Sequence, residues 1–204
     1  MKAEDLDTPV LTIDADALER NIARMKNMTE AAGISYRPHA KTHKSATVAR
    51  MQIDAGATGV CCAKLGEAEV LVSKGIDDIL ITTPVVGESK IGRLLAARNQ
   101  ARISVVADNE ENINMLGRIA QLGGVALDVL VEVDIGQGRC GVAPGPEAAR
   151  LAQIISGHPC LNFAGLQGYQ GKIQMTVDPA ERATQTETGL DKLAATIAEV
   201  ENAG

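Results

Sequence analysis

The sequence predicts an α/β fold in which parallel strands alternate with helices and curve into an incomplete (β/α)8 barrel. Strand-like and helix-like segments alternate along nearly the whole chain of 204 residues, which is the pattern of repeated strand–helix–strand units. About six such units follow residue 34, whereas a complete eight-unit barrel takes about 250 residues. An open, doubly wound sheet is the alternative, but the G-x-G-x-x-G turn typical of it does not follow the first strand.

The individual elements are delimited by apolar periodicity, capping residues and glycines. The first helix has Asp14 or Asp16 as its N-cap and ends at Gly33, and two later helices also end at a glycine. The predicted helices cover residues 15–33, 45–56, 64–75, 87–100, 109–124, 145–157 and 178–204. The predicted strands are the extended segment 9–14 and residues 34–41, 58–63, 77–84, 102–108, 126–136 and 162–171.

Strand alternation predicts polar side chains at the C-terminal ends of the strands, where barrel enzymes have their active sites. In the strand 34–41, Arg37, His39 and Lys41 share one face. In the strand 126–136, the valines share one face and the acidic residues share the other. In the last strand, one face is predicted to carry Phe163, Gly165, Gln167 and Tyr169.

Composition excludes several classes of function. The formal net charge is −6 and no basic stripe is visible, which argues against a nucleic-acid partner. No apolar run approaches the ~18 residues of a membrane span and the N-terminus lacks a secretory signal, so neither membrane insertion nor secretion is predicted. The cysteines lack the C-x-x-C spacing of zinc or redox sites, and reduced thiols in a cytoplasmic protein are the simplest interpretation. They are Cys61, Cys62, Cys140 and Cys160.

The stretch YRPHAKTHKS at residues 36–45 concentrates cationic and titratable side chains in a predicted strand and the turn after it. Lys41 would point inward from the C-terminal end of that strand, partly desolvated and beside Arg37 and His39. Desolvation and like charge both disfavour the ammonium form, and a free amine is nucleophilic enough to form a Schiff base. The alternative is an ion pair across the barrel with Glu132 or Asp134, and spacing alone leaves both interpretations open.

Five segments carry a resemblance to a known family. RPHAKTHKS resembles the lysine motif of the fold-type III pyridoxal-phosphate enzymes, in particular the D-threonine aldolase and D-serine dehydratase branch, which is related to the N-terminal barrel of alanine racemase. Other segments of that branch are similar, in the same order, to DTPVLTIDADALERNI, GVCCAKLGEAE, LVEVDIGQGRCGV and NFAGLQGYQGKIQ. GQGRCGV together with GLQGYQG is most similar to the aldolases that act on D-3-hydroxyamino acids.

The resemblance implies a set of site residues. Lys41 matches the lysine that holds pyridoxal 5′-phosphate, and Arg139 matches the arginine that hydrogen-bonds the phenolic oxygen of the cofactor. Tyr169 matches a residue near the cofactor ring, Gln167 is a further cofactor-binding candidate, and His39 either orients Lys41 or acts as a catalytic base. The alternatives are that Arg139 caps a glycine-rich turn and that Tyr169 is a core aromatic.

The resemblance also implies a longer enzyme, of which this chain is the N-terminal portion. Residues 1–14 would be a strand of a C-terminal β domain, and residues 15–204 a partial barrel. The expected activity is that of a lyase cleaving D-threonine or D-3-hydroxyaspartate to glycine and an aldehyde. A divalent metal (Mn, Mg or Zn) is expected, with its ligands beyond Gly204, and a homodimer is expected by analogy.

Two other functions stay open. A D-serine or 3-hydroxyaspartate dehydratase would share every site residue but would eliminate the hydroxyl group. A pyridoxal-phosphate homeostasis protein would be a single barrel without turnover. All three proteins would bind the same cofactor, and the two enzymes would take a D-amino acid as their small-molecule substrate.

Overall fold

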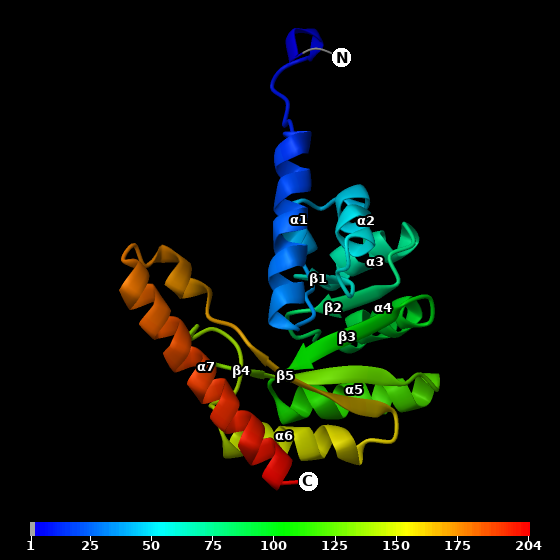
Figure 1. Ribbon diagram of the computed structural model, residues 1–204. Coiled ribbons are helices and arrows are strands. Elements are labelled where there is room, and N and C mark those ends of the chain that lie inside the picture. Colours follow the sequence, from blue (N-terminus) through cyan, green and yellow to red (C-terminus); the bar gives the residue numbers. More distant parts are fainter. Residues whose placement is uncertain (1–2) are drawn as a thin grey trace.

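The computed structural model describes residues 3–204, which form one parallel sheet with helices on its outer side (Figure 1). The five strands follow each other in the sheet in the order of the chain. A doubly wound sheet would instead reverse its strand order at a switch point, so this order identifies a barrel-type sheet and confirms the predicted fold class. The strands are β1 (Val60–Cys62), β2 (Asp78–Ile81), β3 (Arg102–Ala107), β4 (Leu127–Val133) and β5 (Leu161–Gly168).

The described residues form seven α-helices, of which α1 and α2 precede the first strand and the others connect or follow the strands. The first helix is capped as predicted, because the Asp14 carboxylate accepts the Ala17 N–H at 2.9 Å and Gly33 adopts a left-handed φ of 65°. The helices are α1 (Ala15–Ala32), α2 (Ala46–Asp54), α3 (Leu65–Ser73), α4 (Glu88–Arg98), α5 (Glu110–Gly123), α6 (Pro146–Gly157) and α7 (Pro179–Asn202). The 3₁₀ turns are η1 (Ala3–Asp5), η2 (Ala40–Thr42) and η3 (Gly171–Met175). No helix in residues 3–204 is both long enough and apolar enough to cross a bilayer.

The core lies between the sheet and the helices α3 to α6 and is built from aliphatic side chains. Ile79, Ile103 and Val129 are fully buried on the helix-facing side of three adjacent strands. The other side of the sheet carries the polar residues of the alternating pattern, including Asp128 and Glu132 of β4. The predicted division of β4 into a valine face and an acidic face is therefore confirmed.

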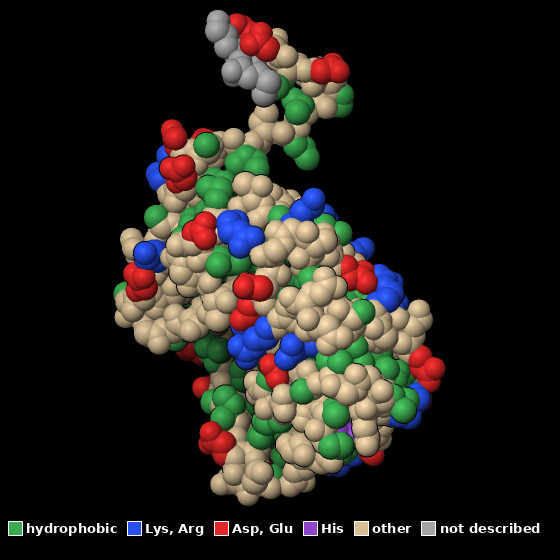
Figure 2. Space-filling model, turned by 90° about the vertical axis from the view of Figure 1, so that its right-hand side faces the viewer, with side chains coloured by type: hydrophobic (Ala, Val, Ile, Leu, Met, Phe, Trp, Pro, Cys, Tyr) green, Lys and Arg blue, Asp and Glu red, His purple; other side chains and the backbone are tan. Residues whose placement is uncertain are grey.

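The outer surface carries interspersed charges. On the face drawn in Figure 2, basic and acidic side chains lie among each other and do not form one large basic patch. Each successive pair of helices from α3 to α6 is joined by one arginine–carboxylate pair. Exposed pairs of this kind contribute little to stability. They are Arg93–Glu69, Arg118–Glu88 and Arg150–Glu110.

The predicted strand at residues 34–41 is wrong as a full strand. The chain makes only an isolated parallel bridge between His39 and Cys61, in which the Cys61 N–H donates to the Pro38 carbonyl at 2.8 Å. Pro38 has no N–H to donate in return, and Ala40 already begins the turn η2. The sheet therefore has five strands, and the segment preceding η2 lies along its β1 edge.

The predicted extended segment 9–14 also forms no strand. Its apolar side chains are exposed, and Leu11 is fully so. In Figure 1 the segment projects away from the sheet at the N-terminal end of α1, where no strand lies beside it to complete a hydrogen-bonded ladder. The assignment of residues 1–14 to a separate β domain stays a prediction, and residues 1–2 lie outside the described part of the chain.

A β-bulge in β5 corrects the predicted faces of that strand. Val129 pairs with Phe163 and Val131 with Leu166, so β5 contains one more residue than β4 between these two pairs. Gly165, at a φ of 113°, lies in the irregular stretch. Phe163 and Leu166 both pack toward α7, whereas Gln167 lies on the opposite face. Strict alternation had placed Phe163 and Gln167 together, which is wrong because a bulge reverses the alternation beyond it.

We expect Gly165→Ala to lower the free energy of unfolding by about 1–3 kcal/mol, since a φ of 113° is strained for any residue with a Cβ. Space is not the cause, because no heavy atom lies within 4 Å of the position that an added Cβ would take. Gly92→Ala, in the interior of α4 and equally unobstructed, is the matched control and should raise stability by about 0.5–1 kcal/mol. Urea unfolding of both variants measures the difference, and equal effects at the two sites would contradict the strain at Gly165.

Arg37 lies at the opposite end of the sheet from the predicted site. Its guanidinium binds the Asp78 carboxylate through two hydrogen bonds of 2.7 and 3.1 Å, near the start of β2. Arg102 and Asn162 both contact Asp128, at 3.4 and 3.0 Å, in the same polar layer. Arg37 is thus engaged with Asp78, and the expected cationic cluster around Lys41 is reduced by one member.

Candidate active site

A cleft of about 180 Å³ at the C-terminal end of the sheet brings together all the predicted site residues. They come from three places in the fold: the segment entering η2, the loop after β4, and the end of β5. This is the end of a parallel barrel at which active sites are found. The cleft is lined by His39, Lys41, Thr82, Arg139, Gln167, Gly168 and Tyr169.

A larger cleft of about 360 Å³ lies between η2 and α3. It has a largely apolar lining, and its main charged contact, the ion pair between Lys44 and Glu67, is already satisfied within the chain. Apart from Lys44 it contains none of the cationic residues of the lysine motif. The smaller cleft is therefore the candidate active site, because the primary amine of Lys41 and the guanidinium of Arg139 converge there.

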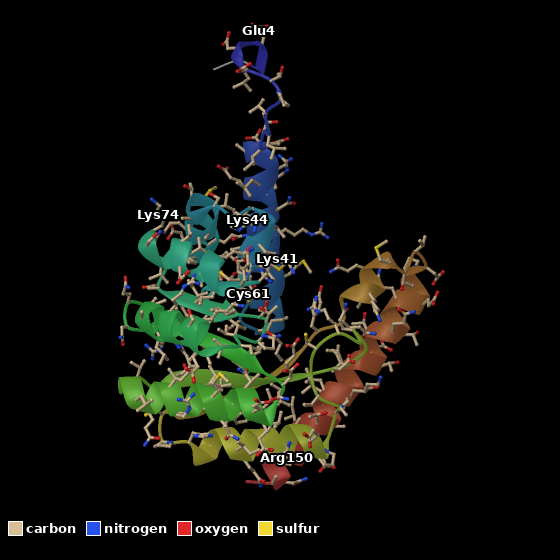
Figure 3. All side chains as sticks on the ribbon, turned by 180° about the vertical axis from the view of Figure 1, so that it is seen from behind. Glu4, Lys41, Lys44, Cys61, Lys74 and Arg150 are labelled. Atoms are coloured by element: carbon tan, nitrogen blue, oxygen red, sulfur yellow. The ribbon has the colours of Figure 1, made fainter. Side chains whose placement is uncertain are left out.

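Lys41 lies in η2 and its side chain is exposed. Figure 3 shows it near Cys61, in agreement with the bridge between His39 and Cys61. Within residues 3–204 its ammonium group has no carboxylate within 4.0 Å, so the alternative of an ion pair with Glu132 or Asp134 is not observed. The side chain is therefore not occupied by either carboxylate, and because it is exposed, the partial desolvation expected for Lys41 is not observed.

The side chain of His39 is fixed from both ring nitrogens. Its Nδ1 accepts the backbone N–H of Lys41 at 3.4 Å, and its Nε2 lies 3.2 Å from the Thr82 hydroxyl. Burial lowers the pKa of His39, and the nearby positive charge of Lys41 lowers it further. The imidazole is therefore kept neutral, next to the lysine whose backbone it contacts.

Arg139 is carried by a loop that is anchored by two carboxylates. The Asp134 carboxylate accepts the N–H groups of Gly136 and Gly138 at about 3.0 Å, and the Asp108 carboxylate accepts that of Gly141 at 2.9 Å. These bonds, first of all that from Gly138, hold the pKa of Asp134 below its usual value. Asp134 thus caps the glycine-rich turn, a role that the sequence left open for Arg139.

The guanidinium of Arg139 lies against Tyr169. The carbon Cζ of Arg139 is 5.5 Å from the centre of the Tyr169 ring, which is within the range of a cation–π contact. Tyr169 is 38% exposed, so it is not a buried core aromatic. Both side chains face the cleft, where a planar anionic ligand could contact the cation and the ring together.

Sequence reasoning missed Thr82, which lines the cleft, and the burial of Glu132 beside it. Thr82 follows β2, on the same face as Asp78, and could have been found by applying the alternation to the predicted strand 77–84. Glu132, the direct register partner of Gln167, is 3% exposed, and its Oε2 has no hydrogen-bond partner. Burial raises the pKa of Glu132, as does the charge of Asp108, while Arg139 and the Gln167 amide oppose the shift.

These shifts predict opposite pH dependences for two variants. The ionised form of Glu132 is unfavourable in the folded state, so wild type loses stability as the pH rises through the folded pKa of this group. Glu132→Gln cannot ionise and should therefore be more stable than wild type above about pH 4.3. Asp134 has a lowered pKa, so its contribution is present above about pH 3.9 and is lost as the pH falls.

Asp134→Asn is therefore the matched control, and should lose stability at neutral pH by an amount that shrinks in acid. Urea unfolding of both variants from about pH 2 to pH 8 measures the two trends, because the Asp134 contribution is lost only below about pH 3.9. The same trend in both variants would contradict these assignments.

The described residues contain no group of three or more His, Cys, Asp or Glu side chains that could hold a metal ion. The cysteines of this part of the chain are free thiols, and burial raises the pKa of Cys62 to about 12. No residue in residues 3–204 is therefore assigned as a metal ligand.

The sheet is of the parallel barrel type and carries a lysine, an arginine and a tyrosine at the C-terminal ends of its strands. This arrangement is typical of the active sites of barrel enzymes. Comparison with known proteins specifies the family: the chain belongs to the alanine racemase N-terminal domain family, which matches residues 13–204. The resemblance stated from the sequence motifs is thereby confirmed.

Individual relatives narrow the position within the family. The chain is 42% identical to the D-threonine aldolase of an Arthrobacter species over 87% of its own length and 47% of that protein. It is 38% identical to the 3-hydroxy-D-aspartate aldolase of Paracoccus denitrificans (strain Pd 1222) over 100% of its own length and 51% of that protein. The chain therefore spans about half the length of these curated relatives.

A solved structure agrees with these sequence relatives. The crystal structure of D-threonine aldolase from Filomicrobium marinum superposes with a TM-score of 0.96 at 42% identity, covering 98% of this chain and 54% of that one. The sheet described above is thus the same arrangement as the corresponding half of a known aldolase.

Proposed function

We propose that this chain forms the cofactor-holding part of a pyridoxal-phosphate-dependent lyase. Its substrates would be D-3-hydroxy-α-amino acids such as D-threonine or D-3-hydroxyaspartate, cleaved to glycine and an aldehyde. The observation that carries the proposal is the convergence of Lys41, Arg139 and Tyr169 in one cleft from three separate parts of the chain. Likeness to two named aldolases supports the choice of reaction.

The donor set of the cleft fits pyridoxal 5′-phosphate. Lys41 offers a primary amine with no competing carboxylate, which is what covalent capture of an aldehyde requires. Arg139 offers a guanidinium that stays charged across the working pH range and suits an anionic phenolic oxygen. Tyr169 offers a ring face beside it, and Gln167 an amide that approaches the Thr82 carbonyl at 3.4 Å.

When bound, the cofactor supplies an electron sink for negative charge at the α-carbon of the substrate. The residues of the chain would bind and orient it. Lys41 would hold the cofactor through its primary amine. Arg139 would stabilise negative charge at its guanidinium throughout, and the neutral His39 would keep the turn of Lys41 in place.

Residues 3–204 contain no ligand set for the divalent metal (Mn, Mg or Zn) that the resemblance implies. No step is therefore assigned to it in this part of the protein. We further propose a homodimer, by analogy with the family that the sequence resembles, and a cytoplasmic location for the whole protein, which the free thiols of the described residues support.

Incubation of the protein with pyridoxal 5′-phosphate, borohydride reduction and peptide mapping test the proposal. The reduced adduct should lie on Lys41, and absorbance of the bound cofactor should disappear from the visible range on reduction. An adduct on Lys44, on Lys64 or on no lysine would overturn it.

Product analysis then separates the candidate reactions. Glycine plus an aldehyde is expected from D-threonine. Ammonia plus a keto acid would identify a dehydratase, and cofactor binding without turnover of any D-3-hydroxyamino acid would identify a cofactor-homeostasis protein.

A further inference from the structure

Thr82 contacts two residues of the candidate site through two different groups. Its hydroxyl oxygen lies 3.2 Å from Nε2 of His39 and 3.1 Å from the Cys62 carbonyl. Its backbone carbonyl accepts the side-chain amide of Gln167 at 3.4 Å. One residue at the end of β2 thus joins the turn that carries Lys41 to the strand that carries Gln167.

The hydrogen atoms of this network can be assigned by counting donors. Nδ1 of His39 accepts the Lys41 N–H at 3.4 Å and therefore carries no hydrogen, so the hydrogen of the neutral ring is on Nε2. Nε2 then donates to the Thr82 hydroxyl oxygen at 3.2 Å. The single hydroxyl hydrogen of Thr82 is left for the Cys62 carbonyl at 3.1 Å, which also accepts the Thr82 backbone N–H at 2.9 Å.

His39 is accordingly neutral and protonated at Nε2. The environment agrees with this state, because burial and the positive charge of Lys41 both lower the pKa of the ring. The charged groups facing the ring are Lys41 on its own turn and Glu67 on α3, and Glu67 acts in the opposite, weaker direction. Both ring nitrogens are occupied, which leaves no free lone pair on His39 to accept a proton from a substrate.

We propose that Thr82 is a positioning residue of this site, which fixes His39 in its neutral Nε2-protonated tautomer and, through His39, the turn that places Lys41. Its consequence for catalysis rests on the proposed function, but the tautomer does not. The network decides between the two roles that the sequence left open for His39: the ring orients Lys41 and does not act as a base.

Nuclear magnetic resonance of the ¹⁵N-labelled protein tests the tautomer directly. The chain has three histidines, so the ring signals of His39 can be assigned by their loss in His39→Asn. The wild-type ring should show a protonated Nε2 and an unprotonated Nδ1 at pH 7.5. The opposite tautomer, or a protonated ring at that pH, would overturn the proposal whatever the variants do.

Two substitutions test the part played by the hydroxyl. Thr82→Val keeps the shape and removes the hydroxyl, and should shift the His39 ring to a mixture of tautomers. Thr82→Ser restores the hydroxyl and should restore the wild-type signals. Unchanged ring signals in Thr82→Val, with circular dichroism like that of wild type, would overturn the proposal.

The rate of covalent labelling of Lys41 by pyridoxal 5′-phosphate supplies a functional readout. Thr82→Val should label about 2- to 10-fold more slowly, the factor that one hydrogen bond of typical strength is worth, and Thr82→Ser should label like wild type. Equal rates in Thr82→Val and wild type would overturn the link from Thr82 to Lys41. If wild type is not labelled at Lys41 at all, the proposed function fails, while the ring signals still decide the role of Thr82.

Discussion

Lys41→Ala is expected to lower kcat for cleavage of D-threonine by at least about 10³-fold and to abolish covalent capture of pyridoxal 5′-phosphate. Losses of this size are typical when the group that forms the covalent bond to the reacting partner is removed. The fold should survive, since the side chain is exposed and its ammonium makes no ion pair within residues 3–204. Thermal unfolding without cofactor should therefore match that of wild type.

Lys41→Arg tests whether Lys41 acts through its positive charge or through its nucleophilic amine. A guanidinium preserves the positive charge that faces His39, but it stays protonated and cannot condense with an aldehyde. Lys41→Arg should consequently be as inactive as Lys41→Ala. Activity in Lys41→Arg would show that Lys41 acts as a charge and not as a nucleophile.

Lys74→Ala provides the matched control. Lys74 is an exposed lysine at the C-terminal end of α3 and lies outside the cleft. Its replacement should leave kcat and labelling unchanged. Loss of activity in both variants would show a general effect of lysine removal and would contradict a special role for Lys41.

The position of Lys41 could be predicted because it depends on local sequence alone. A lysine placed directly after the short extended segment 36–40 lies at the rim of the sheet whether that segment forms a ladder or a single bridge. The helices were predictable for the same reason, since Asp14, Ser45 and Asp178 cap their helices through bonds that span only three residues. Short-range patterns of this kind do not depend on which distant segments become neighbours.

The errors arose where the structure depends on a distant partner. Pro38 removes a donor that only the neighbouring β1 would have used, so the predicted strand shrinks to a bridge. Gly165 introduces a bulge that is visible only in the pairing of β5 with β4, and this bulge turns Gln167 and Tyr169 into the cleft. The predicted residues therefore lie together at one cleft, although the predicted faces of their strand were wrong.

The role of Thr82 and the burial of Glu132 escaped prediction because both depend on neighbouring strands. Thr82 belongs to none of the quoted motifs, and Glu132 is one acidic residue within LVEVDIGQGRCGV. Their contacts to His39 and Gln167 come from other strands. In the strand 126–136, Glu132 was grouped with acidic residues of the inner face, but its burial and lack of a partner emerge only when five strands are assembled. Such residues become visible in a sequence only if the neighbouring strands are already known.

Arg139→Ala should lower kcat by about 10²- to 10³-fold, the loss that follows removal of one preorganised donor to developing negative charge. The effect should be local, because the loop is held by Asp134 and Asp108 through backbone N–H groups and not by the guanidinium. Stability should change by less than about 0.5 kcal/mol in urea unfolding, as for substitutions that break no buried contact. The absorbance of the bound cofactor should change with pH in the variant, because the permanent positive charge next to it is gone.

Arg139→Lys and Arg150→Ala complete the comparison. A lysine at position 139 keeps the charge as a point but loses the planar guanidinium that stacks on Tyr169, so its activity should lie between those of wild type and Arg139→Ala. Arg150 is an exposed arginine whose pairs with Glu110 and Glu147 lie on the helical surface, so its removal should leave kcat unchanged.

If Arg139→Ala kept kcat within about threefold of wild type, the loop would be a scaffold without a charge-stabilising role. The negative charge formed during the reaction would then have to be balanced by a group other than the one permanent cation that lines the cleft in residues 3–204.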